Sequence, residues 1–91
     1  MAGISSVDYE VVQSGYLHLH SGYLGLARHY AALDDRDNEA LFREKCRQAM
    51  TQYNNLYRST PEALTNHQME LLPPVIEELH YLQTKILGRR S

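Results

Sequence analysis

The chain has 91 residues, with nine basic and eleven acidic side chains and a formal net charge of −2. A chain of this length makes one domain with a thin core, and a hydrophobic content of 43% is that of an ordinary globular protein. The charge balance gives no broad positive field and no apolar run approaches the roughly 20 residues that cross a bilayer, so we expect neither nucleic-acid binding nor membrane insertion.

The first predicted helix covers residues 6–33. Its large apolar residues alternate spacings of three and four, at Tyr9, Val12, Tyr16, Leu19, Tyr23, Leu26, Tyr30 and Leu33. This period is typical of a helix packed lengthwise on other helices, with Tyr on one seam position and Leu or Val on the other. A β-hairpin over residues 16–26 is the alternative, because Leu17 to His20 alternate in polarity and Ser21-Gly22 could form a tight turn. The unbroken period favours the helix.

Two glycines mark one edge of this helix. Gly15 and Gly22 are seven residues apart and stand beside Ser14 and Ser21, which makes a strip with almost no side-chain bulk. A glycine in a helix interior costs about 1 kcal/mol relative to alanine, so the strip needs a structural reason. Either another backbone approaches it closely, or it makes room for large tyrosine side chains of a neighbouring helix.

The chain holds seven tyrosines but one phenylalanine and no tryptophan. A buried tyrosine must hydrogen-bond its hydroxyl, whereas a tyrosine at a protein interface can leave it at the wet rim. We therefore hypothesise that the first helix binds a protein partner or a second copy; the alternative is that the rings pack inside the bundle. The predicted partner-binding residues are Tyr9, Gly15, Tyr16, Leu19, Gly22, Tyr23, Leu26 and Tyr30.

The second predicted helix covers residues 38–58, after the polar break that runs from Asp34 to Asn38. Asp37 is the expected N-cap. The apolar stripe of this helix, again spaced three and four, consists of Phe42, Cys46, Ala49, Tyr53 and Leu56. The stripe position favours a small buried residue at Cys46 over a reactive thiol. The pair Glu39 and Arg43, four residues apart, predicts an ion pair on a solvated face.

The third predicted helix covers residues 61–88, and Ser59 with Glu62 has the spacing of a capping box at its start. Its apolar stripe is Leu72, Val75, Leu79, Leu82 and Ile86, and it should end near Gly88, with Arg89 and Arg90 beyond. Because Pro73-Pro74 removes two amide donors, we expect a kink or a split there.

Together these elements predict the fold class. We expect residues 1–91 to form a single all-α domain, a small antiparallel bundle of three helices in up-down-up order. The last helix is kinked or split at Pro73-Pro74.

Five histidines raise the question of a metal site. Glu77-x-x-His80 has the spacing found in di-iron bundles, but the sequence has one copy where such a site needs two and further carboxylates. His18 and His20 point about 200° apart on a helix and would share a metal only on a strand. We therefore predict no metal site and no cofactor, and keep a metal- or ligand-binding bundle as an alternative function.

The segment from His18 to Gly22 resembles the His-x-x-x-Gly core of histidine phosphotransfer domains over those few residues. The resemblance implies a helical bundle with an exposed, phosphorylatable histidine. Ser21 stands where that family has a lysine before the glycine. A histidine phosphotransfer-like domain is therefore a second alternative function.

The expected function is a non-enzymatic one, because no catalytic arrangement or phosphate loop can be identified. The single cysteine cannot form an internal disulfide, and the N-terminal residues lack the basic and apolar regions of a secretory signal, so we expect a cytoplasmic location. We predict a small adaptor, chaperone or regulatory protein that binds a protein partner through its coiled-coil-like first helix, and that self-associates as a homodimer.

Overall fold

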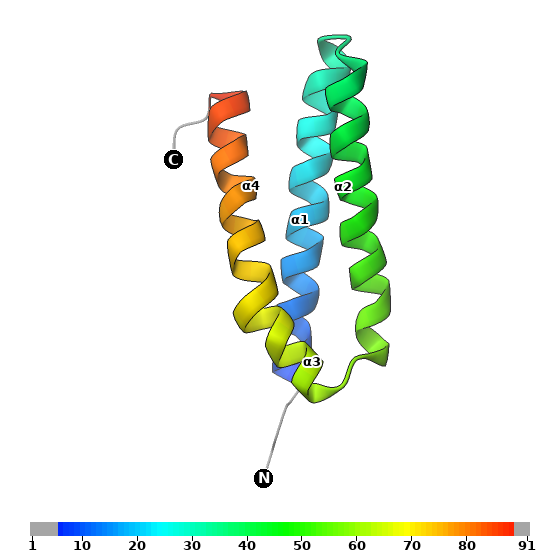
Figure 1. Cartoon of the computed structure of the whole chain (residues 1–91), viewed down its shortest axis with the longest axis vertical. Coiled ribbons are helices and arrows are strands. Elements are labelled where there is room, and N and C mark those ends of the chain that lie inside the picture. The colour runs from blue at the N-terminus through cyan, green and yellow to red at the C-terminus, as the bar shows by residue number, and fades with distance from the viewer. Residues whose placement is uncertain (1–5, 89–91) are drawn as a thin grey trace.

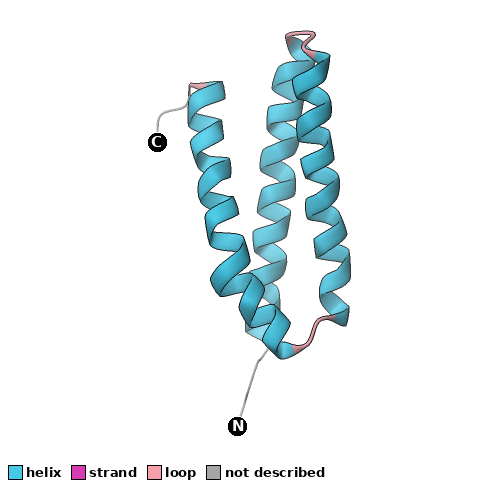
Figure 2. Cartoon of the chain, viewed as in Figure 1, coloured by secondary structure: helices cyan, strands magenta, loops and turns pink. Residues whose placement is uncertain are grey.

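A computed structural model describes residues 6–88. The elements are α1 (Ser6–Ala32), α2 (Arg36–Asn55), a 3₁₀ turn η1 (Leu56–Arg58), α3 (Pro61–Asn66), a π-helical turn η2 (His67–Leu71) and α4 (Leu72–Leu87). Figure 2 shows helices joined by short loops and no strand within residues 6–88. The all-α prediction is confirmed, and the hairpin alternative is excluded because residues 16–26 lie within α1.

The three long helices run up, down and up, so that α1 and α4 are parallel and α2 is antiparallel to both (Figure 1). Helix α1 packs against α2 along its length and against α4, whereas α2 and α4 hardly touch. The radius of gyration is 14.7 Å, above the roughly 12 Å expected for a compact domain of this length. The bundle is therefore open on one side.

The core forms where α2 and α4 pack on α1. Most of the buried apolar residues come from the predicted stripes of the three helices: Val12, Tyr16, Leu19, Tyr23 and Leu26 on α1, Phe42, Cys46, Ala49 and Leu56 further along, and Leu72 and Leu79 on α4. Ala27 and Leu64 are also buried and were not part of a predicted stripe. Leu33, which the heptad pattern included, follows α1 and is exposed. The spacing of three and four thus predicted the buried face of each helix.

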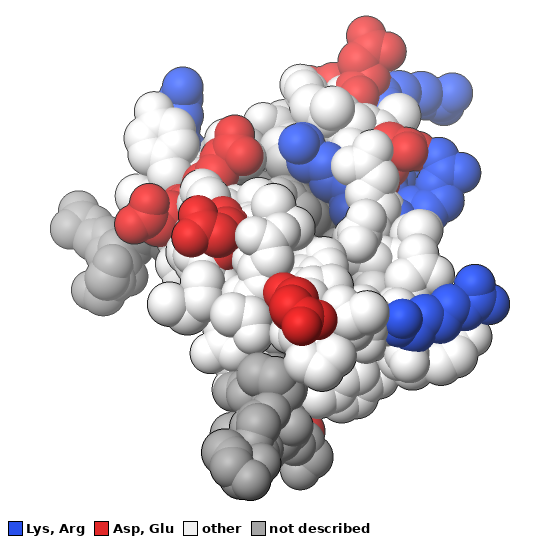
Figure 3. Space-filling model, turned by 60° about the horizontal axis from the view of Figure 1, so that its bottom comes forward, with Lys and Arg blue, Asp and Glu red and all other residues white. Residues whose placement is uncertain are grey.

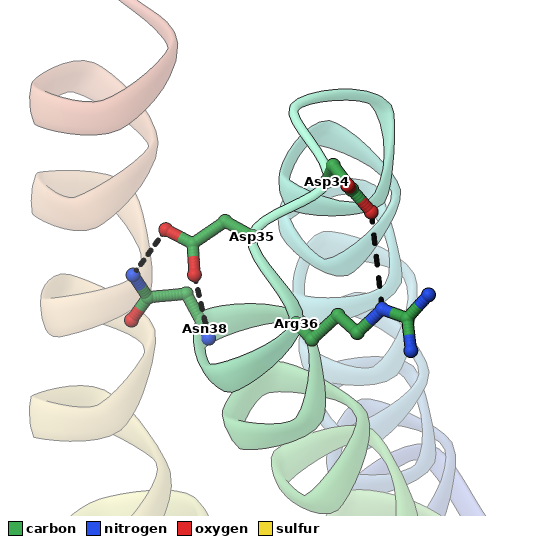
Figure 4. A network of polar contacts seen from close by, with 4 residues as sticks. All are labelled: Asp34, Asp35, Arg36 and Asn38. Carbon is green, nitrogen blue, oxygen red and sulfur yellow. Dashed lines mark hydrogen bonds and ion pairs between the residues drawn. The ribbon is translucent and has the colours of Figure 1, made fainter.

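Helix α2 begins earlier than predicted, and its N-cap is Asp35 and not Asp37 (Figure 4). The Asp35 carboxylate accepts a hydrogen bond from the backbone N–H of Asn38 at 3.3 Å and another from its side-chain amide at 2.9 Å. Asp34 has a left-handed backbone with φ 59°, which turns the chain sharply before the cap. The predicted pair of Glu39 and Arg43 is present, with a distance of 2.9 Å.

Helix α3 is capped by Thr60, one residue after the predicted Ser59. The Thr60 hydroxyl accepts a hydrogen bond from the N–H of Ala63 at 3.1 Å, and Pro61 occupies the first helical turn. Proline is favoured there because the first amides of a helix have no intrahelical acceptor.

The kink predicted at the proline pair is a π-helical turn that immediately precedes it. Within η2 the amide of Leu72 bonds to the carbonyl of His67, five residues back. A wider turn makes room for the rings of Pro73 and Pro74, which lack amide donors and would crowd an α-helical turn. The result is a bent but continuous rod from α3 to α4 (Figure 1).

The last helix ends as predicted, at Gly88, whose φ of 65° is the left-handed conformation that closes many helices. Arg89 and Arg90 lie outside the described residues. Of the helices in residues 6–88, none combines the length and the apolar content of a bilayer-crossing segment.

Candidate functional site

The predicted partner-binding seam lies mostly inside the bundle. Tyr16, Leu19, Tyr23 and Leu26 are 7, 3, 4 and 0% exposed, and Tyr9 and Tyr30 are partly buried against the same core. The reason is that α2 and α4 of the same chain both pack on α1. The structure therefore favours the alternative that the rings pack within the bundle.

The glycine strip is also covered by this chain. A Cβ atom added at Gly15 would lie 2.8 Å from Leu72 Cδ1, and one added at Gly22 would lie 2.5 Å from Leu79 Cδ2. The strip thus receives two leucines of α4, seven residues apart like the glycines themselves. The strip does admit a close neighbour, but the neighbour is in the same chain and consists of leucine side chains, not of a second backbone or of tyrosines.

Tyrosine rings of α1 stack on a ring of α2, and the hydroxyl of Tyr16 forms a hydrogen bond at the edge of the core. The rings of Tyr30 and Tyr23 stack on Phe42 at centroid distances of 5.8 and 6.2 Å. The Tyr16 hydroxyl is hydrogen-bonded to Nδ1 of His67 at 2.6 Å. Within the described residues, no buried side-chain nitrogen or oxygen lacks a hydrogen-bond partner. The Tyr16 hydroxyl is therefore satisfied inside one chain, and the rings of Tyr23 and Tyr30 pack on Phe42 of the same chain.

An open groove, which we call the α2/α4 groove, lies where α2 and α4 fail to meet. It has a volume of about 450 Å³. Its floor is α1, and the residues along it are Tyr16, Leu19 and Tyr23 from the floor, Lys45, Gln48, Ala49 and Gln52 from α2, and His67, Leu71, Leu72, Val75 and Glu78 from η2 and α4. Three residues of the predicted seam thus form the floor of the groove, although each of them is buried.

The groove has dimensions that suit a bound helix. Its floor extends from Tyr16 to Tyr23 and its α2 wall from Lys45 to Gln52, and in each case the two end residues are seven positions apart. Seven residues of α-helix are about two turns, or about 10 Å. The residues of the floor recur every three or four positions, and those of the two walls do so apart from the adjacent pairs Gln48-Ala49 and Leu71-Leu72, so each row presents one helical face to the groove.

Charges of opposite sign stand on the two walls. The Lys45 ammonium lies 5.7 Å from the centroid of the Tyr23 ring. The pKa of Tyr23 is raised by burial and then by the negative charges of Glu78 and Cys46. Lys45 and Glu78 therefore both lie near Tyr23, one on each wall of the groove. In Figure 3 most basic side chains lie on the right, the side of α2, and a group of acidic ones lies on the left, the side of α4.

Sequence reasoning missed the walls of the groove. Lys45, Gln48 and Gln52 flank the apolar stripe of α2 at the same spacing, a signal that equally describes a solvated helix face. Val75 was predicted as part of the α4 stripe, yet it is exposed on the groove wall. Which flank becomes a groove depends on how α2 and α4 diverge, and that divergence has no local sequence pattern.

The histidines are placed differently from the predicted pairs. His18 meets His80 across α1 and α4, with their Nε2 atoms 2.9 Å apart. His20 lies on another side of α1, where its backbone carbonyl is 3.5 Å from the Cys46 thiol. Glu77 and His80 are both exposed on α4. Within the described residues, no group of three or more His, Cys, Asp or Glu side chains is arranged to hold a metal ion.

The single cysteine is buried, as its position on the α2 stripe predicted. Burial raises the pKa of the Cys46 thiol, and the charge of Arg43 opposes this in part. A thiol in this setting is protonated at neutral pH and a poor nucleophile.

Comparisons with protein-family models, with curated proteins and with solved structures found no match to this chain.

Proposed function

We propose that this protein is a non-enzymatic interaction module that self-associates, and that its α2/α4 groove receives helix α4 of a second copy. The observation that carries the proposal is the groove itself: α2 and α4 diverge over α1, and the buried seam residues Tyr16, Leu19 and Tyr23 line the floor between them. The proposal keeps the expected self-association and moves the contact from the outside of α1 to this groove.

A helix is the occupant that the shape favours. Two helical walls and a helical floor, each at least two turns long, resemble the surroundings of a core helix in a four-helix arrangement. The floor offers aromatic and aliphatic side chains, whereas the walls add amides and charges. An amphipathic helix with one apolar stripe matches this pattern of an apolar centre and a polar rim.

A second copy supplies such a helix. Leu71 at the end of η2 is 46% exposed and Val75 on α4 is 36% exposed, so η2 and α4 have an apolar edge that their own chain leaves uncovered. A two-fold axis parallel to the helices would set each α4 into the groove of the other copy. This axis leaves the position of each residue along the length of the bundle unchanged, so Lys45 of each copy would meet Glu78 of the other. The charges on the two walls are thus self-complementary.

The module is proposed to act as a small cytoplasmic adaptor, chaperone or regulator. Binding by a helix seat requires no chemistry from the side chains, only the shape and polarity of the groove.

Mass in solution tests the proposal, with Val75→Arg as the variant and Val11→Arg as its control. Both valines are exposed, Val75 at 36% and Val11 at 45%, but only Val75 lines the groove. Light scattering should show a mass rising with concentration from 10.5 kDa towards twice that value for the native chain and for Val11→Arg. Val75→Arg should remain monomeric because it places a charge at the proposed contact.

Circular dichroism of both variants shows whether they fold. A native chain that stays monomeric at high micromolar concentration would overturn the self-association. Equal dimerisation of the two folded variants would show that the contact lies elsewhere.

A further inference from the structure

We propose that His18 and His80 form a binding site for a divalent late transition-metal ion, which would clamp α1 to α4. The two Nε2 atoms lie 2.9 Å apart and both side chains are exposed. The ring centroids are 5.1 Å apart with an interplanar angle of 81°, so the two nitrogens point at each other. This site is independent of the α2/α4 groove, which neither histidine lines.

The helix packing explains why the two rings meet. His18 lies between Gly15 and Gly22, and these two glycines let Leu72 and Leu79 of α4 pack directly on α1. His80 follows Leu79, so the same close approach brings its ring to His18. The two histidines are 62 residues apart in the chain. Two ligands on two packed helices are held in place by the fold before an ion arrives, which reduces the entropic cost of binding.

The distance suits adjacent ligands of one ion. At a metal–nitrogen distance of about 2.0 to 2.1 Å, two ligands that subtend a right angle lie about 2.9 Å apart. Right angles occur in the square-planar and octahedral geometries of Cu²⁺ and Ni²⁺. The rings need only turn so that their lone pairs converge on a common point, and their exposure leaves room for that rotation. Water would complete the coordination, because the described residues offer no third histidine, cysteine or carboxylate.

The protons balance without an acid or base from the protein. In the empty pair, one neutral imidazole donates its Nε2 proton to the Nε2 lone pair of the other. Coordination through both Nε2 atoms requires both rings to carry their proton on Nδ1. The donor ring therefore loses its Nε2 proton to water and gains one at Nδ1 from water. The metal–nitrogen bonds replace one hydrogen bond, with no net proton release.

The test is a titration of the untagged full-length chain with Ni²⁺, followed by calorimetry and by thermal unfolding. The native chain should bind one ion, and its melting temperature should rise because the ion binds only when α1 and α4 are packed. His18→Gln and His80→Gln should each weaken binding by about tenfold or more, because the remaining imidazole loses its intramolecular partner. His20→Gln is the matched control and should bind like the native chain.

The double variant with both substitutions should bind about as weakly as either single variant, because a single imidazole already forms no chelate. Unchanged affinity in folded His18→Gln or His80→Gln would overturn the proposal. Loss of binding in His20→Gln would place the site elsewhere and would overturn it equally. The melting temperature of each variant without metal shows whether the substitution itself disturbs the fold.

Discussion

At the scale of single residues, Gly22 and Gly25 show how one residue type has two roles in the same helix. A Cβ at Gly22 would lie 2.5 Å from Leu79, which is fully buried and has little room to move, whereas a Cβ at Gly25 meets nothing within 4 Å. Gly22 is therefore required by the packing of α4, and Gly25 only lowers the helix propensity of α1.

This difference predicts opposite effects of alanine. Gly25→Ala should stabilise the protein by about 0.5 to 1 kcal/mol, the gain in helix propensity at an open site. Gly22→Ala makes the same gain but overpacks Leu79 at a cost of about 1 to 3 kcal/mol, so it should be neutral or destabilising. Urea unfolding of both variants measures the difference. Equal stabilisation by both would mean that α4 does not pack on Gly22.

Burial also acts on titratable residues. Desolvation raises the pKa of Tyr16, of Tyr23 and of the Cys46 thiol above their ordinary values. In alkaline solution the folded chain then keeps protons that the unfolded chain has already lost, so the free energy of unfolding falls as pH rises. We expect stability against urea to decline above about pH 9, where the unfolded thiol and phenols begin to ionise. A profile that stays flat to about pH 11 would contradict the burial of these groups.

At the scale of the elements, the start of α2 separates two neighbouring aspartates. Asp35→Ala should cost about 1 kcal/mol, because it removes the side chain that caps the helix. Asp37→Ala should cost less, since this exposed residue makes only a favourable charge interaction with the first turn. Thermal unfolding of the two variants provides the comparison. A larger loss of stability in Asp37→Ala would show that Asp37 is the N-cap, as predicted from the sequence.

The sequence predicted the helices well because their signals are local. Alternating apolar spacings determine the buried face of each helix, and the polar segment after Leu33 and the prolines mark the turns. The exact caps were missed at Asp35 and Thr60, since several polar residues in a row can each accept the capping hydrogen bond. The form of the kink was also missed, because a proline pair predicts a lost hydrogen bond but not the π turn that accommodates it.

The candidate sites were harder to predict because they depend on contacts between distant residues. The sequence pattern of the tyrosine seam is the same whether the seam packs on helices of its own chain or on those of another chain. His18 was considered only with His20, and His80 only with Glu77, because spacing along one helix relates near neighbours alone. Their actual pairing follows from the register of α4 on α1, which the glycine strip fixes.

At the scale of the whole molecule, the chain is a flat, elongated bundle of 52 × 26 × 16 Å. Its smallest dimension is little more than the diameter of one helix with its side chains, about 10 to 12 Å. A chain of this size buries a smaller share of its surface than a larger domain does, so a second copy that fills the α2/α4 groove would enlarge a thin core. The dimer is therefore also a proposal about stability, and unfolding should become harder at higher protein concentration.

The most direct test of the account is sedimentation equilibrium of a charge-swap series. Lys45→Glu and Glu78→Lys should each weaken the dimer, because each places like charges opposite one another across the interface. The double variant should restore it, since the pairs re-form with reversed signs. Circular dichroism of each variant separates loss of the dimer from loss of the fold. Dimerisation that is indifferent to all three changes, or a native chain that never exceeds the monomer mass, would contradict the central claim that α4 of a second copy fills the groove.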